Sequence, residues 1–317
     1  MYPSFFSLDR PISSFLSFLL NAFIIFFGSL QMDVLTHHGV IEVSLDDSYS
    51  GLMKKINHND FQVPGLLLKS AVVLLDLDHH IKVGEYDFAQ GDPVWSLFFK
   101  MVTGKARQYP FKIIEGEDKF DVERSLSNSP YLQKTGEILT EGSLLPDTYL
   151  FLKGDTDQDV IQRANKAQAE YVDSIWADRD QAVPWKSKRE AVIVASMLEK
   201  ESGAFDERQI ITRVIINRLR KNMRLQIDAT AIYGLNHIQH VYYKHLTVKN
   251  ALNTYRMKGL PKHPICMPSR DSLYAALHPK GGHDILYYIL MSNGRHHFSK
   301  SLAEHRKMKE KIRHAPR

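Results

Sequence analysis

Cysteine is almost absent from this sequence, and so are the short signatures of several enzyme classes. Cys266 is the only cysteine, so the chain can form no intramolecular disulfide, and cysteine usage does not indicate a cellular compartment. The sequence contains no Gly-x-Ser-x-Gly elbow, no phosphate-binding Gly-x-x-x-x-Gly-Lys-Ser/Thr loop and no His-Glu-x-x-His or His-x-x-Glu-His motif. His237 and His240 could hold a metal, but without further ligands nearby we interpret them as a polar surface loop.

Charged residues are missing from one long stretch near the N-terminus. Pro11–Met32 has none, and about 20 apolar residues are enough to span a bilayer. A signal peptide is the alternative, and a buried helix is a third, but only Arg10 is basic before the stretch and no small-residue cleavage site follows it. We therefore expect an uncleaved anchor. The flanking charges favour a cytoplasmic N-terminus, which would place most of the chain outside the cytoplasm.

Composition is ordinary for a globular protein and allows two domains. The 317 residues are 44% hydrophobic and 24% charged, with a net charge of +5. The charge suits an anionic partner, but no nucleic-acid-binding motif is present and the basic run Arg306–Arg313 is typical of a solvated helix face. Residues 33–106 alternate as in a small α+β module, with strands expected at Ile41–Val43 and Lys82–Phe88 and a helix from Asp92 to Gly104.

The most informative stretch is Ser187–Gly203. Ser187 and Glu190 fit a capping box, the residues from Ala191 to Leu198 are apolar except for Ser196, and Gly203 fits a C-cap, so we expect one buried helix. Two carboxylates, Glu199 and Glu201, end it. Glu201 has the larger apolar neighbours on the helix face, so burial and the negative end of the helix dipole should raise its pKa and suit it to general acid catalysis. Solvated helix-end charges are the alternative interpretation.

Further helices are expected at Asp155–Ala177, at Asp206–Lys221 with Asp206 as N-cap, at Leu273–Leu277 and at Ser299–Lys311, with a strand at Ile285–Met291. Polar and aromatic residues gather in the loops that follow the second of these helices. Such a cluster resembles a sugar-binding cleft, although each member alone is more often a turn or cap residue. The members are Gln226, Asp228, Thr230, Tyr233, Asn253, Thr254 and Tyr255.

Several spaced blocks, in order, resemble the endolytic murein transglycosylase (MltG/YceG-like) family. They are ASMLEKES (Ala195–Ser202), VIINRLRKNMRLQIDATAIYG (Val214–Gly234), NTYRMKGLPKHPI (Asn253–Ile265), EGSLLPDTY (Glu141–Tyr149), GRHHFSKSLAEH (Gly294–His305) and VGEYDF (Val83–Phe88). Two blocks depart from the family pattern: Asp228-Ala229-Thr230 replaces Asp-Pro-Thr, and Lys262-His263 replaces Pro-Gly.

The resemblance implies an α+β chain in three parts. These are a cytoplasmic tip and transmembrane helix over residues 1–32, a small LysM-like α+β module over 33–106, and a lysozyme-like, mainly helical catalytic domain over 107–317. It also implies that Glu201 is catalytic, with no metal and no organic cofactor. Substrate-binding candidates are the loop cluster above together with Asn217, Glu141 and Asp147.

The implied activity is endolytic cleavage of the β-1,4 bonds between MurNAc and GlcNAc in nascent peptidoglycan strands, leaving a 1,6-anhydro-MurNAc end and limiting strand elongation. Implied partners are the glycan strands, the inner membrane that holds the single-pass anchor, and peptidoglycan synthases as a further candidate, with no nucleic acid. The catalytic part would lie on the periplasmic side. Two alternatives stay open: a lysozyme-type hydrolase using Asp228 as second carboxylate, and a membrane-tethered scaffold that binds glycan without cutting it.

Overall fold

The computed structural model describes residues 38–44, 47, 51–52, 54–55, 81–233 and 243–314. The expected anchor over residues 1–32 lies outside this part of the chain. Among the helices that the structure describes, none combines the length and apolarity needed to cross a bilayer. The chain divides into two compact units, Met1–Tyr109 and Pro110–Arg317.

The described part of the first unit is a strand pair with one helix. β1 (Gly39–Val43) and β2 (Gly84–Phe88) are antiparallel, with Ile41 opposite Tyr86, and these two side chains alternate inward with the pleat. α4 (Val94–Thr103) follows Pro93 and ends at Gly104, which adopts a left-handed φ of 72° that costs glycine little. The expected helix and strands are confirmed here. The LysM-like assignment of residues 33–106 stays a prediction.

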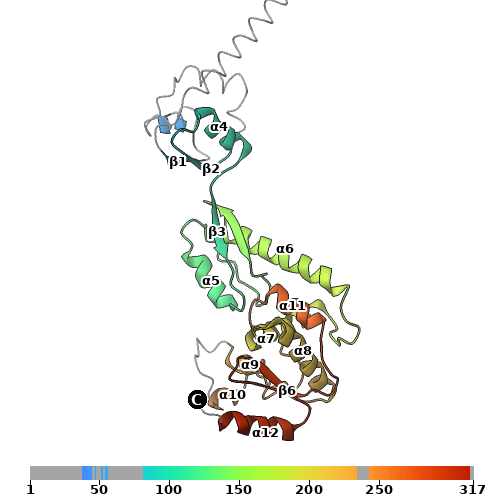
Figure 1. Ribbon diagram of the computed structural model, residues 1–317. Coiled ribbons are helices and arrows are strands. Elements are labelled where there is room, and N and C mark those ends of the chain that lie inside the picture. Colours follow the sequence, from blue (N-terminus) through green and yellow to red (C-terminus); the bar gives the residue numbers. More distant parts are fainter. Residues whose placement is uncertain are drawn as a thin grey trace, which may run out of the picture. The chain divides into compact units, whose positions relative to one another are not determined.

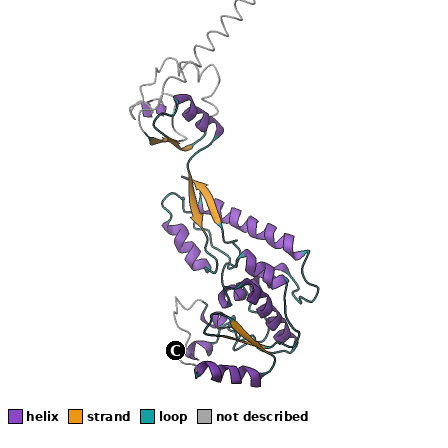
Figure 2. Cartoon of the chain, viewed as in Figure 1, coloured by secondary structure: helices purple, strands orange, loops and turns teal. Residues whose placement is uncertain are grey.

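The second unit is mainly helical and carries two small sheets (Figures 1 and 2). β3 (Gln108–Lys112), which begins at the unit boundary, pairs with β4 (Thr148–Leu152). Between them α5 (Lys119–Asn128) begins at Asp118, whose side chain accepts the Asp121 N–H. α6 (Asp157–Trp176) begins with a complete capping box of Thr156 and Asp159. The mixed α+β class is therefore confirmed. β4 was not expected from the sequence.

Three helices build the core that carries the candidate site. α7 (Lys188–Glu201) packs against α11 (Arg270–Leu277) and α8 (Phe205–Arg220), and its apolar run from Ala191 to Leu198 is buried between them. A helix that is apolar on nearly every face must have those faces covered by other elements, and α8 and α11 pack against this run. Trp185 closes the same core and donates its indole N–H to the Ala276 carbonyl at 2.8 Å.

The C-terminal part is a hairpin with one helix. β5 (Tyr287–Leu290) and β6 (His296–Ser299) are antiparallel, with Tyr288 opposite Phe298. α12 (Leu302–Arg313) follows Ser301 and contacts both strands. Two short helices, α9 (Asp228–Ile232) and α10 (Tyr243–Leu246), lie in the chain between α8 and the hairpin (Figure 1). α9 corrects our expectation of an irregular loop at Met223–Gly234, and β6 was also not expected.

Helix ends differ from the sequence-based expectations in three places. α7 is capped by Ser202, whose N–H bonds the Leu198 carbonyl at 3.2 Å, rather than by Gly203. At its other end Ser187 accepts the Glu190 N–H, but the Glu190 carboxylate accepts from Lys186 N, so only half of the capping box forms. α8 begins after Ala204, and Asp206 lies in its first turn, because its carboxylate binds Arg295 instead.

Candidate active site

Glu199, at the end of α7, is held by neighbouring side chains of the core. Its Oε1 accepts from Arg208 Nη2 at 3.0 Å, and its Oε2 accepts from the Ser269 N–H at 2.8 Å and the Ser269 hydroxyl at 2.5 Å. Both side chains of the ion pair are nearly enclosed, at 6% exposure for Glu199 and 8% for Arg208. Both carboxylate oxygens of Glu199 are therefore engaged within the protein, and the side chain links α7 to α8 and to the start of α11.

Glu201 has a different environment two residues later. Its Oε2 accepts a hydrogen bond of 2.9 Å from the Tyr288 hydroxyl on β5, and its other carboxyl oxygen has no hydrogen-bond partner among the described residues. Burial raises the pKa of Glu201 above its ordinary value, and the negative charge of Asp228 adds to this; the Tyr288 hydrogen bond and the charges of His296 and Arg218 oppose it. The sequence argument that one carboxylate is buried deeper is incomplete, because the partners, more than depth, separate the two residues.

Arg218 is a buried cation whose positive charge, after that of His296, acts to lower the pKa of Glu201. The guanidinium donates to the Leu286 carbonyl at 2.7 Å and to the Leu225 carbonyl at 2.6 Å, and it lies 5.4 Å from the centre of the Tyr287 ring. Burial lowers its pKa, and the side chain still acts electrostatically on Glu201. α8 thus places a fixed cation beside the candidate acid without forming a salt bridge to it.

Asp228 and Tyr255 form the second polar pair at this site. The Tyr255 hydroxyl donates to Asp228 Oδ1 at 2.5 Å, which ties the first turn of α9 to the loop that follows α10. Burial raises the pKa of Tyr255, as do the hydrogen bond to Asp228 and the charge of Glu201. The structure therefore brings these two sequence-predicted residues together with Glu201, and the Asp228 carboxylate is the exposed member of the group.

A network behind Tyr288 fixes the hairpin against α8. The carboxylate of Glu207 accepts from the His296 N–H at 2.9 Å, binds His296 Nδ1 at 2.7 Å, and accepts from the Ser202 hydroxyl at 3.0 Å. Burial acts to raise the pKa of Glu207, but the hydrogen bonds from His296 and Ser202 outweigh it and hold the pKa below its ordinary value. The His296 ring then meets the Tyr288 ring edge-on at 5.4 Å, so the network positions the group that binds Glu201.

Four predicted ligand residues turn out to support the loops from inside. The Asn217 amide donates to the Gly282 and Ile285 carbonyls, and the Asn253 amide donates to the Leu246 and Val248 carbonyls. Thr230 and Thr254 are fully buried, with 2.8 Å between their hydroxyl oxygens, and Thr254 Oγ1 accepts the Ile227 N–H at 2.9 Å. Thr230, Asn253 and Thr254 use their side-chain polar groups within the protein, whereas Asn217 does so with its amide N–H₂ group and its Oδ1 has no hydrogen-bond partner among the described residues. Their assignment as substrate-binding residues stays a prediction.

The remaining predicted residues lie elsewhere or face solvent. Tyr233 donates to Glu141 Oε2 at 2.6 Å, and burial raises the pKa of Glu141; neither side chain is hydrogen-bonded to Glu201. Asp147 lies 3.5 Å from Arg270. Gln226 is exposed and has a left-handed φ of 51°, so its backbone turns the chain into α9. Within the described ranges no group of three or more His, Cys, Asp or Glu side chains is arranged to hold a metal.

Sequence reasoning missed Tyr288, His296 and the role of Arg218. Tyr288 lies in the expected strand at Ile285–Met291, where alternation alone leaves open which face meets another element. His296 lies in one of the family blocks, and only pairing of β6 with β5 brings it to Tyr288. A buried arginine on an otherwise apolar helix face was the one signal that could have marked Arg218.

The arrangement suits general acid–base chemistry: a carboxyl with a raised pKa lies at a helix end, beside a buried cation and an exposed carboxylate. Comparison with known proteins identifies the family of the chain. A sequence profile of the YceG-like family matches residues 41–311, so the chain belongs to the YceG-like family.

Relatives with a stated activity match part of the chain. The endolytic murein transglycosylase of Bacillus subtilis (strain 168) is 38% identical over 173 residues, which are 54% of this chain and 47% of that protein. The endolytic murein transglycosylase of Streptococcus pneumoniae (serotype 2, strain D39) is 22% identical over 190 residues, 57% of this chain and 33% of that protein. The match thus spans less than half of each relative.

A solved structure resembles the chain over most of its length. A YceG-like protein from Listeria monocytogenes superposes with a TM-score of 0.53 at 25% sequence identity, covering 86% of this chain and 100% of that chain. The similarity supports the same family assignment at the level of the fold.

Proposed function

We propose that this protein is a lytic transglycosylase that cuts the β-1,4 bond between MurNAc and GlcNAc inside peptidoglycan glycan strands. The observation that carries the proposal is Glu201, a carboxyl with a raised pKa whose only hydrogen-bond partner in the described structure is the Tyr288 hydroxyl. The family match over residues 41–311 includes Glu201, and two relatives of the chain are named endolytic murein transglycosylase.

In the proposed reaction one carboxyl acts twice. Protonated Glu201 gives its proton to the glycosidic oxygen, so the bond between that oxygen and the anomeric carbon of MurNAc breaks and GlcNAc leaves with a free hydroxyl. The 6-hydroxyl oxygen of the same MurNAc attacks the anomeric carbon, and its proton passes to the Glu201 carboxylate. The product carries a 1,6-anhydro ring, no water is consumed, and Glu201 returns to its starting state.

The neighbours of Glu201 fit the two protonation states. Tyr288 occupies Oε2, which leaves the other oxygen to carry the proton toward the substrate. When the proton leaves, the positive charge of Arg218 stabilises the carboxylate, and the negative charge of Asp228 opposes it, so neither form is locked in. The Tyr255–Asp228 pair is the best candidate for orienting the sugar at the reacting bond.

The hydrolase alternative uses the same residues differently. Ordinary glycosidases need a second carboxylate as nucleophile or base, and exposed Asp228 is the candidate. Its Oδ1 already accepts the Tyr255 hydroxyl at 2.5 Å, and this engagement within the protein favours an orienting role.

Product mass separates these reactions. Purified peptidoglycan is digested with the full chain, and the soluble fragments are weighed by mass spectrometry. We expect 1,6-anhydro-MurNAc ends produced at internal positions of uncrosslinked strands, lighter by one water than the hydrolysis products. Fragments with only reducing MurNAc ends would favour the hydrolase, and intact strands would favour a scaffold that only binds glycan.

The location follows from the same proposal. The uncharged run Pro11–Met32 would anchor the chain in the inner membrane with the catalytic unit on the periplasmic side, where nascent strands are made. In this arrangement the enzyme would limit strand elongation and would work beside peptidoglycan synthases.

A further inference from the structure

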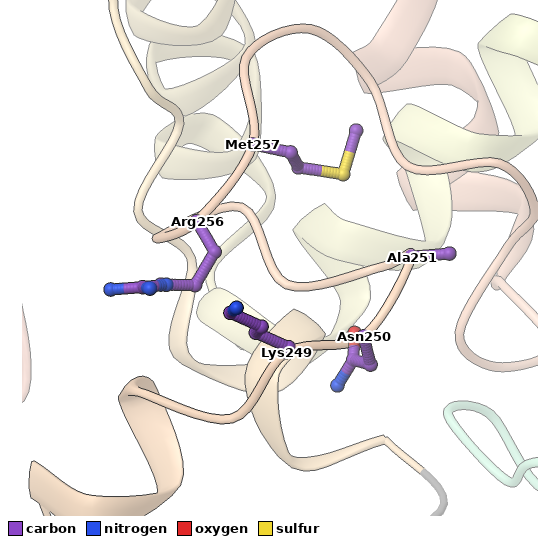
Figure 3. Close-up of a pocket in the computed structure, with 5 residues that line it drawn as sticks. All are labelled: Lys249, Asn250, Ala251, Arg256 and Met257. Carbon is purple, nitrogen blue, oxygen red and sulfur yellow. The ribbon is translucent and has the colours of Figure 1, made fainter.

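A basic pocket lies on the loop that carries Tyr255. It is lined by Lys249, Asn250, Ala251, Arg256 and Met257, and Figure 3 shows these side chains on the turn of chain between Lys249 and Met257. Arg256 directly follows Tyr255, whose hydroxyl binds Asp228 and whose charge interactions reach Glu201. The pocket is thus continuous along the chain with the proposed catalytic site.

The loop is held in shape from below. Asn250 Oδ1 accepts the Leu252 N–H at 2.8 Å and the Asn253 N–H at 2.6 Å. The Asn253 carbonyl in turn accepts the Arg256 N–H at 2.9 Å and the Met257 N–H at 3.2 Å. Because the Asn250 oxygen is used inside the loop, its side-chain N–H₂ group is the part left to meet a ligand.

Neither cation of the pocket has a counter-charge among the residues that the structure describes. Lys249 and Arg256 are exposed, and no salt bridge or side-chain hydrogen bond joins either one to the described part of the chain. Two unpaired cations with an amide donor are a recognition set for an anion, and the side chains of Met257 and Ala251 add an apolar wall. A small anion attached to an apolar group fits this combination.

We propose that this pocket binds a carboxylate of the peptide stem that peptidoglycan carries on its MurNAc residues. The inference rests on the proposed function, because that substrate brings the anion. Stem peptides combine free carboxylates with small apolar side chains, as the lining requires. The pocket would then recognise strands that still bear their peptides and would hold them in register with Glu201.

Binding without turnover tests the inference. The parent protein is the full chain with Glu201→Gln, and its affinity is measured for two matched glycan oligomers. One bears stem peptides with free carboxylates, and the other bears the same peptides with the carboxylates converted to primary amides. The affinities are compared with those of the parent carrying Lys249→Gln and Arg256→Gln, and of a matched control carrying Lys221→Gln and Lys258→Gln, two exposed lysines outside the pocket.

We expect the parent and the control to bind the free-acid oligomer roughly 2- to 30-fold more tightly than the amidated one, the range for two exposed ion pairs. The pocket variant should lose this preference, so that its two dissociation constants become nearly equal. A parent that does not distinguish the oligomers, or a pocket variant that keeps the preference, would overturn the inference. So would inorganic phosphate that displaces the strand while amidation has no effect, since this identifies a phosphate site.

The outcome is separable from that of the proposed function. Wild-type protein that prefers the free-acid oligomer but cuts no bond would contradict the proposed activity and support the proposed carboxylate pocket. If the wild-type protein cuts both oligomers and the Glu201→Gln parent binds them equally, the proposed activity is supported and the proposed carboxylate pocket is contradicted.

Discussion

At the scale of single residues, the two carboxylates that end α7 lie in contrasting environments. Glu199 is paired with Arg208 and hydrogen-bonded to Ser269, whereas the Glu201 carboxylate has, within the described part of the chain, a hydrogen bond to the Tyr288 hydroxyl alone. The side chains are chemically identical and lie on one helix, so their different behaviour comes entirely from what α8, α11 and β5 place beside them. This contrast makes the pair a matched test of the catalytic assignment.

Glu201→Gln keeps the shape of the side chain but removes its proton. We expect activity on peptidoglycan to fall at least about 100-fold, the usual share of general acid–base catalysis. The pKa of Glu201 is raised in the folded protein, so the wild type is most stable, as far as this group is concerned, while the carboxyl is protonated. That contribution of Glu201 to the unfolding free energy is fully present below the unfolded pKa of about 4.3 and is lost as pH rises through the folded pKa. Thermal unfolding should therefore show the Gln variant gaining stability over wild type as pH rises from acid to slightly alkaline values.

Glu199→Gln is the control and should behave in the reverse way. It leaves Arg208 as a buried cation without its carboxylate, which costs about 3 kcal/mol of unfolding free energy. Activity per folded molecule should stay close to that of wild type below the melting transition. A Glu199→Gln variant that loses activity while keeping its stability would contradict the assignment of Glu201 and indicate that Glu199 is the general acid.

At the scale of elements, the site depends on contacts between segments that are distant in the chain. The sequence predicts α7 well, because its apolar run and polar start carry their own signal. It does not predict β4 or β6, since each is defined by a partner strand, and a short strand has little signal of its own. Tyr288 and His296 reach the site only through the β5–β6 hairpin, which explains why they were missed.

The same limit applies to the polar loop residues that the sequence analysis assigned to the substrate. Asn217, Thr230, Asn253 and Thr254 are the types that bind sugars, but the same donors and acceptors also satisfy buried backbone groups. Residue type does not distinguish these uses. Asp228 and Tyr255 were assigned by the same reasoning, and the structure does bring them to Glu201.

Thr254→Val tests whether the buried threonine pair is structural. The change removes the acceptor of the Ile227 N–H and the partner of the Thr230 hydroxyl, so unfolding free energy should fall by about 1–3 kcal/mol. The exposed Thr247→Val, which loses only a bond to the Lys244 carbonyl, should change it by less than about 0.5 kcal/mol. Chemical denaturation measures both. Weakened glycan binding at unchanged stability would instead place Thr254 in the substrate site.

At the scale of the whole chain, the region that matches the family does not coincide with either of the two compact units. The YceG-like profile covers residues 41–311, so it crosses the boundary between the two compact units at Tyr109 and Pro110. The sequence adds one segment to this picture, the uncharged run Pro11–Met32, which lies before the matched region and outside the described residues. If this run is an anchor, as we propose, it would place the proposed activity at the membrane.

Membrane fractionation tests that role. The full chain should sediment with membranes and resist extraction by high salt, because an apolar run of this length is held by hydrophobic transfer rather than by charge. A chain beginning at Asp33 should remain in the aqueous fraction and still cut glycan. Replacing Ile24 and Ile25 by lysine should release the full-length chain as well, since each charge at a membrane centre costs about 2.5–3.5 kcal/mol. Full-length protein that is uncleaved and stays in the aqueous fraction would show that Pro11–Met32 is not an anchor, and the proposed site of action would then have to be reconsidered while the assignment of Glu201 stood unchanged.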